Sequence, residues 1–510
     1  LRSLGPRTPL AGPDAEAPMA RAASGARLFA EPLRAGAKTP FARGRRVRIG
    51  VWEGRMSQQR SMFEEGSVRA QVVEVSGARY GRRALVQRPV RNQGLLPGAL
   101  PTLDGLIGAD HPVRALWQVV EELDLTALEA HNGSNVDSGG RPSVDVRILL
   151  AVWLYATTQG EARASVIAER CLQDAPYVWL CGGVRVGERT ISGFRTSHEA
   201  QLDALLTQLI AVLMQEDLVE VWRTAQDGTR VRASASSGSF HRLGTMERAY
   251  EQAQQHLVEV KAAAADPRRS KVARAAAERG AQERIERIAA AMERVREVAA
   301  HKKLDADQLH DVKKAPRAST TDPDATVMKM GDGGFRPAYN VQFATAADRS
   351  GVIVGVEVTT RGTDQGQMPA MLEQVHERTG VRPEEHLVDK GYASHQAIEA
   401  AAEAGTLVFA PLPTKLAEPG SRRDGEYSEQ SRAWIERMQT EQGKAIYKLR
   451  SEVAELSNAR AKATYGLAQL FVRGLVGVTC CALLVALANN VERLISLRAQ
   501  AQAVSSMTRS

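Results

Sequence analysis

The chain has 510 residues, of which 43% are hydrophobic and 25% charged, with a formal net charge of +8. This length allows two or three domains, and the composition is that of a soluble globular protein rather than a fibrous or disordered one. Residues 1–60 hold 12 Lys and Arg against 4 Asp and Glu, so the rest of the chain is electrically balanced. Any DNA-binding surface outside this segment must therefore be a local patch.

The first 61 residues differ from the rest. They are rich in Ala, Gly, Arg and Pro and lack apolar periodicity, so residues 1–61 are predicted to be a disordered basic tail. The chain begins at Leu1, and Met56 and Met62 are available as later starts. Readthrough upstream of the true start is the leading explanation, in which case the tail is not translated. A transit peptide and a genuine DNA-binding arm are the alternatives.

Cysteine usage and hydropathy indicate the compartment. The four cysteines, Cys171, Cys181, Cys480 and Cys481, lack zinc-ligand spacing, and the adjacent pair is a poor disulfide candidate. We therefore expect buried thiols in a reducing cytoplasm. The longest apolar run, residues 474–488, is about 15 residues long, which is short for a bilayer span, so a buried core helix and no membrane partner are expected.

A helical region is predicted next. Short helices joined by tight connections are typical of a helix-turn-helix-like DNA-binding module, and a helical domain without nucleic-acid contact is the alternative. We place this all-helical domain at residues 98–217. Apolar residues at helical spacing predict helices over residues 113–123, 144–156, 162–172 and 191–214.

Basic residues near the last of these helices are candidates for DNA contact. Thr190 is the predicted N-cap of the helix that starts at Ile191, and Arg189, Arg195 and His198 flank or occupy that helix. Their side chains could contact phosphates or bases. The alternative is that they only solvate a helix face.

The period then changes. Alternating apolar residues over 219–233 predict a strand hairpin that turns at Gly228. Two apolar stripes at helical spacing follow, separated by Asp266-Pro267. We predict an antiparallel helical hairpin inserted at about residues 240–302, with a structural role or a role as an arm in dimer or DNA contact.

Strands and helices alternate in the remaining part of the chain. This order predicts an α/β catalytic domain over residues 218–497, with a mixed sheet flanked by helices. The predicted strands cover residues 338–343, 352–358, a segment ending at Asp389, and 406–410. The predicted helices cover 368–378 and 394–404, a polar loop covers 411–444, and a final helical region covers 447–497.

Three acidic residues carry the functional hypothesis. Asp227 and Asp389 each follow an apolar strand, and Glu455 lies on a later helix. Three such carboxylates can converge and hold Mg²⁺, which prefers oxygen ligands. Two ions about 3.5–4 Å apart clamp the attacking and leaving oxygens of a phosphoryl transfer. Taken singly, the aspartates would be turn or capping residues, and Glu455 would lie on a solvated helix face.

The helix around Glu455 carries further candidates. Lys462 lies within about 20° of Glu455 on an ideal helix, and Tyr447 lies roughly 80° away at the edge of that face. Arg450 lies roughly 140° away and shares the face only if the helix is irregular there. Tyr447 and Lys462 could hold the phosphate backbone of a bound strand, and ordinary surface pairing is the alternative.

With these residues, the chain resembles the DDE transposases of bacterial insertion sequences, specifically the branch numbered eleven-eighty-two. The resemblance runs from about residue 94 to residue 494. Its motifs are, in chain order, Asp110-His111-Pro112-Val113-Arg114-Ala115-Leu116, Gly140-Arg141-Pro142, Ala225-Gln226-Asp227-Gly228-Thr229, Ser319-Thr320-Thr321-Asp322-Pro323-Asp324-Ala325, Tyr339-Asn340-Val341-Gln342, Gly366-Gln367-Met368, Val388-Asp389-Lys390-Gly391-Tyr392, and the set of Tyr447, Arg450, Glu455 and Lys462.

The resemblance implies an RNase-H-like catalytic domain, interrupted by the helical hairpin and preceded by a helical domain that recognises terminal inverted repeats. It also implies Mg²⁺-dependent cleavage and joining of double-stranded DNA, with Mn²⁺ able to substitute. A metal-activated water would attack the element's end, and the freed 3′ hydroxyl would attack target DNA. A homodimer on DNA, associated with the bacterial nucleoid, is expected. The catalytic and metal-binding positions are Asp227, Asp389 and Glu455, and the DNA-contacting positions beside them are Tyr447, Arg450 and Lys462.

Some residues depart from the family pattern. Ala454 stands where Val is usual, an aromatic or small residue is usual near Asn458, and Glu452 offers a second acid one turn from Glu455. Two alternatives to a transposase therefore stay open. One is a related nuclease that cleaves without joining, and the other is a decayed transposase that only binds DNA.

Three other acids are expected to have structural roles. Asp364 could rival Asp389, but capping of the following helix is the preferred interpretation. Asp322 and Asp324 flank Pro323 and are expected in a turn, with DNA contact as the alternative.

Overall fold

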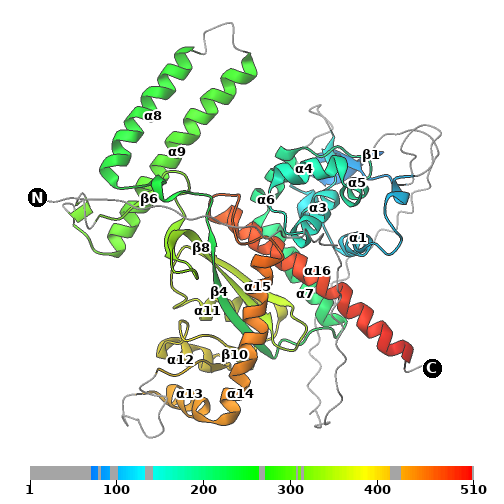
Figure 1. Cartoon of the computed structure of the whole chain (residues 1–510), viewed down its shortest axis with the longest axis vertical. Coiled ribbons are helices and arrows are strands. Elements are labelled where there is room, and N and C mark those ends of the chain that lie inside the picture. The colour runs from blue at the N-terminus through cyan, green and yellow to red at the C-terminus, as the bar shows by residue number, and fades with distance from the viewer. Residues whose placement is uncertain are drawn as a thin grey trace, which may run out of the picture. The chain divides into compact units, whose positions relative to one another are not determined.

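The structure is a computed structural model, and Figure 1 shows its elements. It describes residues 71–78, 82–91, 102–131, 142–263, 270–305, 308–309, 311, 315–413 and 427–507. The predicted tail at residues 1–61 lies outside the described residues, as do Gly140-Arg141 and the predicted breaker Asp266-Pro267. All described elements belong to one unit of the chain, Arg60–Ser510.

Helices dominate the first part of the described chain. They are α1 (Pro112–Glu122), α2 (Thr126–Glu129), α3 (Val146–Thr158), α4 (Ala164–Gln173), α5 (Ala175–Cys181), α6 (Glu188–Ser197) and α7 (Glu199–Gln215). Side-chain N-caps define two of the starts, because His111 accepts a hydrogen bond from Val113 N and Asp145 accepts one from Arg147 N. The helices predicted over 113–123, 144–156 and 162–172 are confirmed as α1, α3 and α4, with ends shifted by one or two residues.

The helix predicted over 191–214 is wrong in two respects. It is interrupted at His198, where the backbone leaves the helical region (φ −128°, ψ 38°), so α6 and α7 are separate helices. The N-cap of α6 is Gly187 rather than Thr190, and α6 therefore begins before Arg189 instead of after it. Apolar periodicity continues across the break, which is why the sequence pattern did not reveal it.

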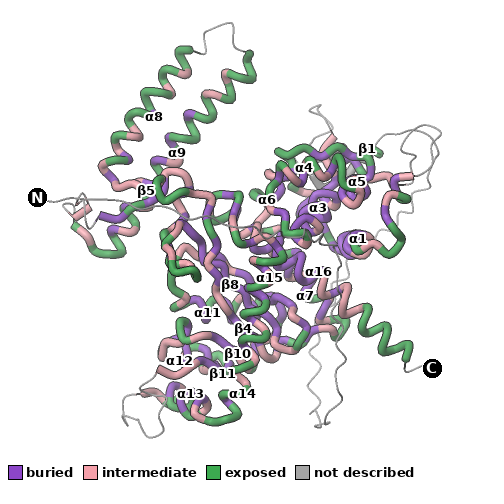
Figure 2. The backbone as a smooth tube through the Cα atoms, in the orientation of Figure 1, coloured by how far each residue is buried: buried purple, intermediate pink, exposed green. Residues whose placement is uncertain are grey.

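A C-terminal helix completes the core of this helical part. α16 (Leu475–Met507) packs against α7, α3 and α6, and its first half is buried whereas its last turns are exposed (Figure 2). By length and composition α16 could cross a membrane, but 78% of its most apolar window is buried inside the protein. The prediction of a buried core helix is confirmed. Cys171, Cys181 and Cys480 are buried free thiols as expected, and Cys481 is partly exposed.

A mixed sheet forms the centre of the second part. Its strands run in the order β11 (Leu407–Phe409), β10 (Glu385–Leu387), β4 (Arg223–Arg232), β8 (Phe335–Ala346) and β7 (Thr326–Lys329), and β9 (Ile353–Thr359) also pairs with β8. β11, β10 and β4 are mutually parallel, whereas β7, β8 and β9 form antiparallel pairs. This order and these directions fit an RNase-H-like fold.

The predicted hairpin at Gly228 is wrong. β4 runs straight through Gly228 for ten residues and pairs with β8 along its whole length, from Thr224↔Ala346 to Arg232↔Ala338. A turn is unnecessary because the partner strand lies more than 100 residues later in the chain. The glycine instead allows close packing, since a Cβ at Gly228 would lie 2.2 Å from Gln342 Nε2.

Helices cover both faces of this sheet. α11 (Met368–Thr379) lies on one face, where Met371 and Val375 fill the space above Gly355. The opposite face is covered by α14 (Glu441–Arg450), a π-helical turn (Ser451–Glu455) and α15 (Leu456–Ala463), with Ser457 Oγ 3.1 Å from Thr345 Oγ1. α12 (His395–Glu403) follows β10 and begins at Ser394, whose hydroxyl accepts a hydrogen bond from Ala397 N.

The segment predicted as a polar loop contains helices. α13 (Glu429–Gln439) and the start of α14 lie within residues 411–444, and residues 414–426 lie outside the described part. Ser428 and Thr440 are N-caps of the two helices, and Trp434 is 1% exposed. The polar composition hid these helices because only one narrow stripe of each is buried.

Two long helices project from the sheet (Figure 1). α8 (Leu243–Ala263) and α9 (Lys271–His301) pack against each other along a stripe that includes Met246, Ala253, Ile288 and Val295. A short antiparallel pair, β5 (Phe240–His241) with β6 (Ala318–Ser319), joins the two ends of this insertion. A small separate sheet contains β1 (Gln71–Ala78), β2 (Arg82–Arg88) and β3 (Ser143–Val144).

Candidate active site

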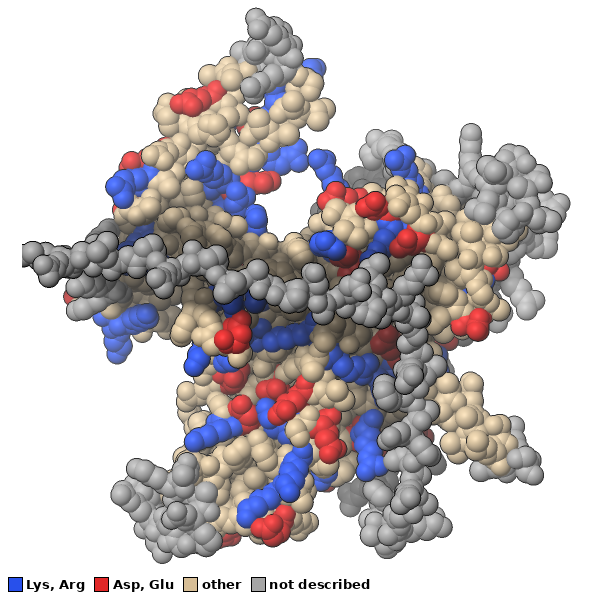
Figure 3. Space-filling model, in the orientation of Figure 1, with Lys and Arg blue, Asp and Glu red and all other residues tan. Residues whose placement is uncertain are grey.

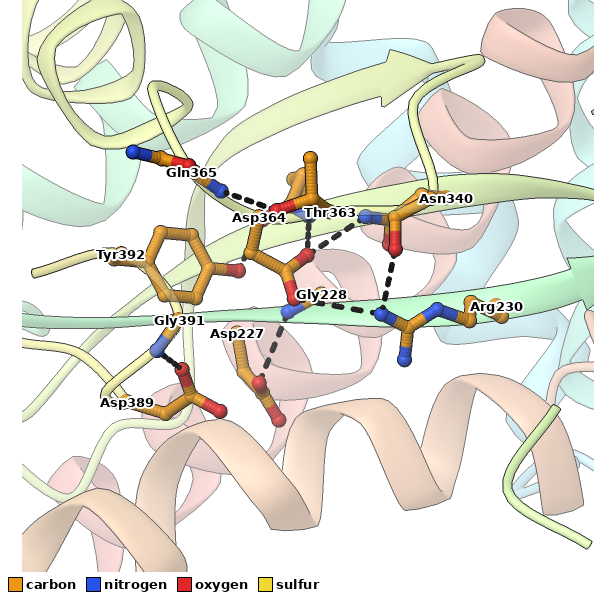
Figure 4. Close-up of polar contacts among 12 residues, drawn as sticks. Asp227, Gly228, Arg230, Asn340, Thr363, Asp364, Gln365, Asp389, Gly391 and Tyr392 are labelled. Carbon is orange, nitrogen blue, oxygen red and sulfur yellow. Dashed lines mark hydrogen bonds and ion pairs between the residues drawn. The ribbon is translucent and has the colours of Figure 1, made fainter. Parts of the chain in front are cut away.

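Asp227 and Asp389 are neighbours because adjacent parallel strands carry them. β10 pairs with β4 from Glu385↔Arg223 to Leu387↔Ala225. Two residues further along both strands, this register brings Asp389 beside Asp227, and strand periodicity puts both on the same sheet face. Figure 4 shows the two side chains next to each other above a helix. Asp389 follows the end of its strand as predicted, whereas Asp227 lies within β4 rather than at its end.

A π-helical turn brings Glu455 into contact with Arg450, which also contacts Asp227. In a regular helix Arg450 and Glu455 would lie on different faces, but residues 451–455 form a π-helical turn, in which hydrogen bonds run from i to i+5. Arg450 Nη1 consequently lies 3.1 Å from Glu455 Oε1, and Arg450 Nη2 lies 3.0 Å from Asp227 Oδ1. The helix is therefore irregular at the one point where the Arg450 prediction required it.

The carboxylate of Asp227 is held on both oxygens. Oδ1 accepts a hydrogen bond from Gly228 N at 3.0 Å and forms an ion pair with Arg450 Nη2 at 3.0 Å, and Oδ2 accepts a hydrogen bond from Asn458 Nδ2 at 3.0 Å. Burial raises the pKa of Asp227, and the nearby Asp389 adds to this, whereas Arg450 and Asn458 lower it. The positive charge and the amide thus offset part of the cost of burying this carboxylate.

The donor set fits a hard divalent cation. Asp227, Asp389 and Glu455 offer carboxylate oxygens only, which Mg²⁺ and Mn²⁺ prefer. Arg450 already bridges Asp227 and Glu455, so two of the three carboxylates converge on one positive charge. Within the described ranges, no three His, Cys, Asp or Glu side chains are already close enough to hold a metal. A bound cation would therefore compete with Arg450 for these oxygens.

The predicted DNA-contacting residues on this helix have different surroundings. Arg450 is only 8% exposed and is engaged by carboxylates, so in this structure it neutralises Asp227 and Glu455 instead of facing solvent. Tyr447 and Lys462 are half-buried. Burial lowers the pKa of Lys462, with a further contribution from Arg230, while Asp227 raises it. Lys462 thus places positive charge close to Asp227, and acidic and basic side chains are interleaved over the face in Figure 3.

A buried hydrogen-bonded chain lies on the sheet face opposite Asp227. His386 Nδ1 lies 2.8 Å from Thr224 Oγ1, and its Nε2 lies 3.2 Å from Gln226 Oε1. An amide oxygen only accepts, so Nε2 carries the proton and Nδ1 accepts from the threonine hydroxyl. Burial lowers the pKa of His386 to about 3, which keeps the ring neutral. Gln226 Nε2 then donates to Gln342 Oε1 at 3.2 Å.

The buried hydrogen bonds of His386 predict that the stability of the protein falls at acidic pH. The unfolded His386 titrates near pH 6.5, whereas the folded one binds a proton only near pH 3. Its contribution to stability is therefore complete above about pH 6.5 and is lost as the pH falls toward 3, at up to about 1.4 kcal/mol per pH unit. Urea unfolding of the wild type and of His386→Gln between about pH 7 and pH 4 measures this. As the pH falls, the free energy of unfolding should decrease more for the wild type than for His386→Gln. A difference between the two proteins that does not depend on pH would contradict the lowered pKa of His386.

The predicted DNA-binding residues of the helical part do not form one set. Arg189 is exposed at the start of α6. Arg195 is 3% exposed, donates to Ala162 O and stacks over Trp153 with its guanidinium carbon 4.5 Å from the ring centroid. The prediction that Arg195 contacts DNA is wrong for this conformation, because its charge is used within the core. His198 is half-buried, and burial lowers its pKa.

Other acids and amides have roles that the sequence pattern missed. Asp364 does not cap the next helix, whose N-cap is Gln367, so that prediction is wrong. Asp322 and Asp324 hold the start of α16, accepting from Gly474 N at 3.1 Å and Leu475 N at 2.8 Å. In the sequence, the position of Asn458 stands out only as a departure from the family pattern, whereas in the structure its amide donates to Asp227 Oδ2. The signal in the sequence that could have indicated this role is a polar residue on the apolar side of a helix, at the position of Asn458.

Two parts of the chain match known families. Residues 315–491 match the family described as Transposase DDE domain, and residues 101–197 match the family described as Transposase domain (DUF772). The first match includes Asp389 and Glu455, and Asp227 lies before it, so the structure is what joins Asp227 to the other two acids. No curated protein and no solved structure matches the chain.

Proposed function

We propose that this chain, which carries two transposase domains, is a DDE transposase of a bacterial insertion sequence. It would bind terminal inverted repeats, cleave DNA at the element's ends and transfer the freed strands to target DNA. The observation that carries the proposal is the convergence of Asp227, Asp389 and the helix of Glu455 at one point of the sheet, with Arg450 bridging two of the three carboxylates.

The residues of the chain have separate tasks in this mechanism. Asp227, Asp389 and Glu455 would hold divalent cations. Such ions, when bound, activate the attacking oxygen and stabilise the leaving oxygen of an in-line phosphoryl transfer. Arg450 holds Asp227 and Glu455 together in this structure, and it would be available to pair with a phosphate if these carboxylates held the ions instead. Lys462 would hold the strand near Asp227 by its charge.

A cleavage and strand-transfer assay tests the proposal. A labelled duplex carrying the inverted repeat that flanks the gene is incubated with full-length protein and Mg²⁺. Transposition requires both a cut at the repeat end and joined product in a target plasmid. Cleavage without joining would indicate the related nuclease, and specific binding without cleavage would indicate a decayed transposase.

Repeat recognition is expected to involve the helical part. Arg189→Ala should weaken binding to repeat DNA and reduce the dependence of log affinity on log salt by about one unit, because one phosphate contact is lost. Fluorescence anisotropy with full-length Asp227→Asn protein at several salt concentrations measures this without cleavage. The full chain is needed because α16 completes the core of α3, α6 and α7, so a fragment ending at residue 217 would expose that core.

Arg287→Ala is the control for this measurement. Arg287 lies on α9 and is 39% exposed, and the inserted hairpin is the other region where recognition could occur. A larger loss of affinity in Arg287→Ala than in Arg189→Ala would move recognition to the hairpin. Equal affinity of the parent protein for repeat and scrambled DNA at matched salt would remove sequence recognition altogether.

A further inference from the structure

Asp364 lies directly beneath the candidate active site, in the loop between β9 and α11. Its Oδ1 accepts hydrogen bonds from Asn340 Nδ2 at 2.7 Å and from Gln342 Nε2 at 2.8 Å. Its Oδ2 lies 3.7 Å from Arg230 Nη2. Figure 4 shows Asp364 between Asn340, Arg230 and Tyr392, with Asp227 and Asp389 on the far side of the strands.

Two glycines that follow the aspartates lie close to this carboxylate. A Cβ at Gly228, the residue after Asp227, would lie 2.5 Å from Asp364 Oδ1. A Cβ at Gly391, two residues after Asp389, would lie 3.7 Å from Asp364 Oδ2 and 2.9 Å from Asp389 Oδ1. Asp364 therefore packs near the backbone next to both aspartates. A side chain at Gly228 would obstruct it, whereas the separation from Gly391 is an ordinary van der Waals contact.

The hydrogen bonds around Asp364 connect the two strands that carry the aspartates. Gln342 Oε1 accepts from the hydroxyl of Tyr392, in the loop after Asp389, and from Gln226 Nε2, in the residue before Asp227. Gln342 therefore links both strands, and its amide nitrogen is directed to Asp364. Asn340, Gln342 and Tyr392 are each no more than 1% exposed, so these bonds are not replaced by water at low cost.

Asp364 is poorly placed to be a metal ligand itself. One oxygen already has two amide donors, and the other faces a guanidinium. Asp364 packs against Gly228, and successive residues of a strand point to opposite faces of the sheet. Asp364 and the side chain of Asp227 therefore lie on opposite faces of the sheet. Its contacts are instead those of a residue that orients others.

We propose that Asp364 is a positioning residue for the reaction, which accepts hydrogen bonds from Asn340 and Gln342 and thereby sets the separation of Asp227 and Asp389. This inference rests on the proposed function. An error of about 1 Å in the placement of reacting groups costs on the order of 100-fold in rate, so loosening of this support is expected to be measurable.

Two substitutions at Asp364 separate acceptance of hydrogen bonds from negative charge. Asp364→Asn keeps an oxygen that accepts from both amides, so its rate of repeat cleavage at saturating Mg²⁺ should stay within about 5-fold of wild type. Asp364→Ala removes the acceptor and should slow cleavage by about 10- to 100-fold. Calorimetric Mg²⁺ binding, the second readout, should change by less than about 3-fold in both variants, since neither loses a ligand oxygen.

Matched variants make the result decisive. Gln365→Ala, at the exposed neighbouring position, should behave as wild type. Gln342→Met keeps the side-chain volume but removes the hydrogen bonds to Tyr392 and Asp364. Its cleavage rate should therefore match that of Asp364→Ala, and it replaces that variant if Asp364→Ala does not fold.

Three outcomes would contradict these proposals. If Asp364→Asn is as inactive as Asp227→Asn, the positioning role is overturned in favour of a charge or ligand role. Asp364→Ala or Gln342→Met as active as Gln365→Ala would overturn any role. Activity of Asp227→Asn would instead contradict the proposed function.

Discussion

Asp227→Asn and Asp389→Asn are each expected to abolish cleavage in Mg²⁺, with rates reduced at least about 10³-fold, while binding to repeat DNA is retained. The substitution keeps the size of the side chain but removes the negative charge that a divalent ion requires. In the wild type, Arg450 and Asn458 contact the Asp227 carboxylate, and in the Asp227→Asn variant the same donors would face an amide. Cleavage of an end-labelled repeat duplex by full-length protein, alongside anisotropy of binding, measures both quantities.

Asp332→Asn is a suitable control for these variants. Asp332 is also paired with arginines, Arg336 and Arg232, but it is 49% exposed and lies in the loop before β8. The Asp332→Asn protein should cleave repeat DNA at the wild-type rate. Normal cleavage by either Asp227→Asn or Asp389→Asn would disprove the triad.

Glu455→Gln is expected to lose cleavage by at least about 100-fold, whereas Glu452→Gln should stay within about 3-fold of wild type. Both glutamates are exposed and belong to the same π-helical turn, so they form a matched pair. Only Glu455 is joined to Asp227 through Arg450. The measurement is the same cleavage assay, at equal occupancy of repeat DNA.

The opposite result has a clear meaning. If Glu452→Gln is the inactive variant, the register of the π-helical turn differs in the active complex, and the relation of Lys462 to the third acid changes with it. If both variants are active, the third ligand lies elsewhere. Circular dichroism of both proteins would show whether the helix itself is retained.

Local patterns in the sequence were sufficient for several elements. α11 and α12 begin and end close to their predicted positions, because apolar periodicity and caps such as Ser394 act over a few neighbouring residues. β8 and β9 were likewise evident from their apolar runs. Residue type and the preceding elements are also enough to make the two aspartates and the glutamate candidates for the site.

The arrangement of the site depended on contacts between distant parts of the chain. β4 passes through Gly228 without turning because β8 pairs with it from more than 100 residues away, and Asn458 reaches Asp227 across 231 positions. A regular helix would have separated Arg450 from Glu455, and the π-helical turn that joins them has no periodic signature in the sequence. The burial of Arg195 and the position of Asp364 under Gly228 follow equally from packing. Sequence by itself thus determined several of the elements and which acids they carry, since those signals are local. Only the tertiary structure decided which side chains meet, because burial and hydrogen bonding depend on partners that no local window contains.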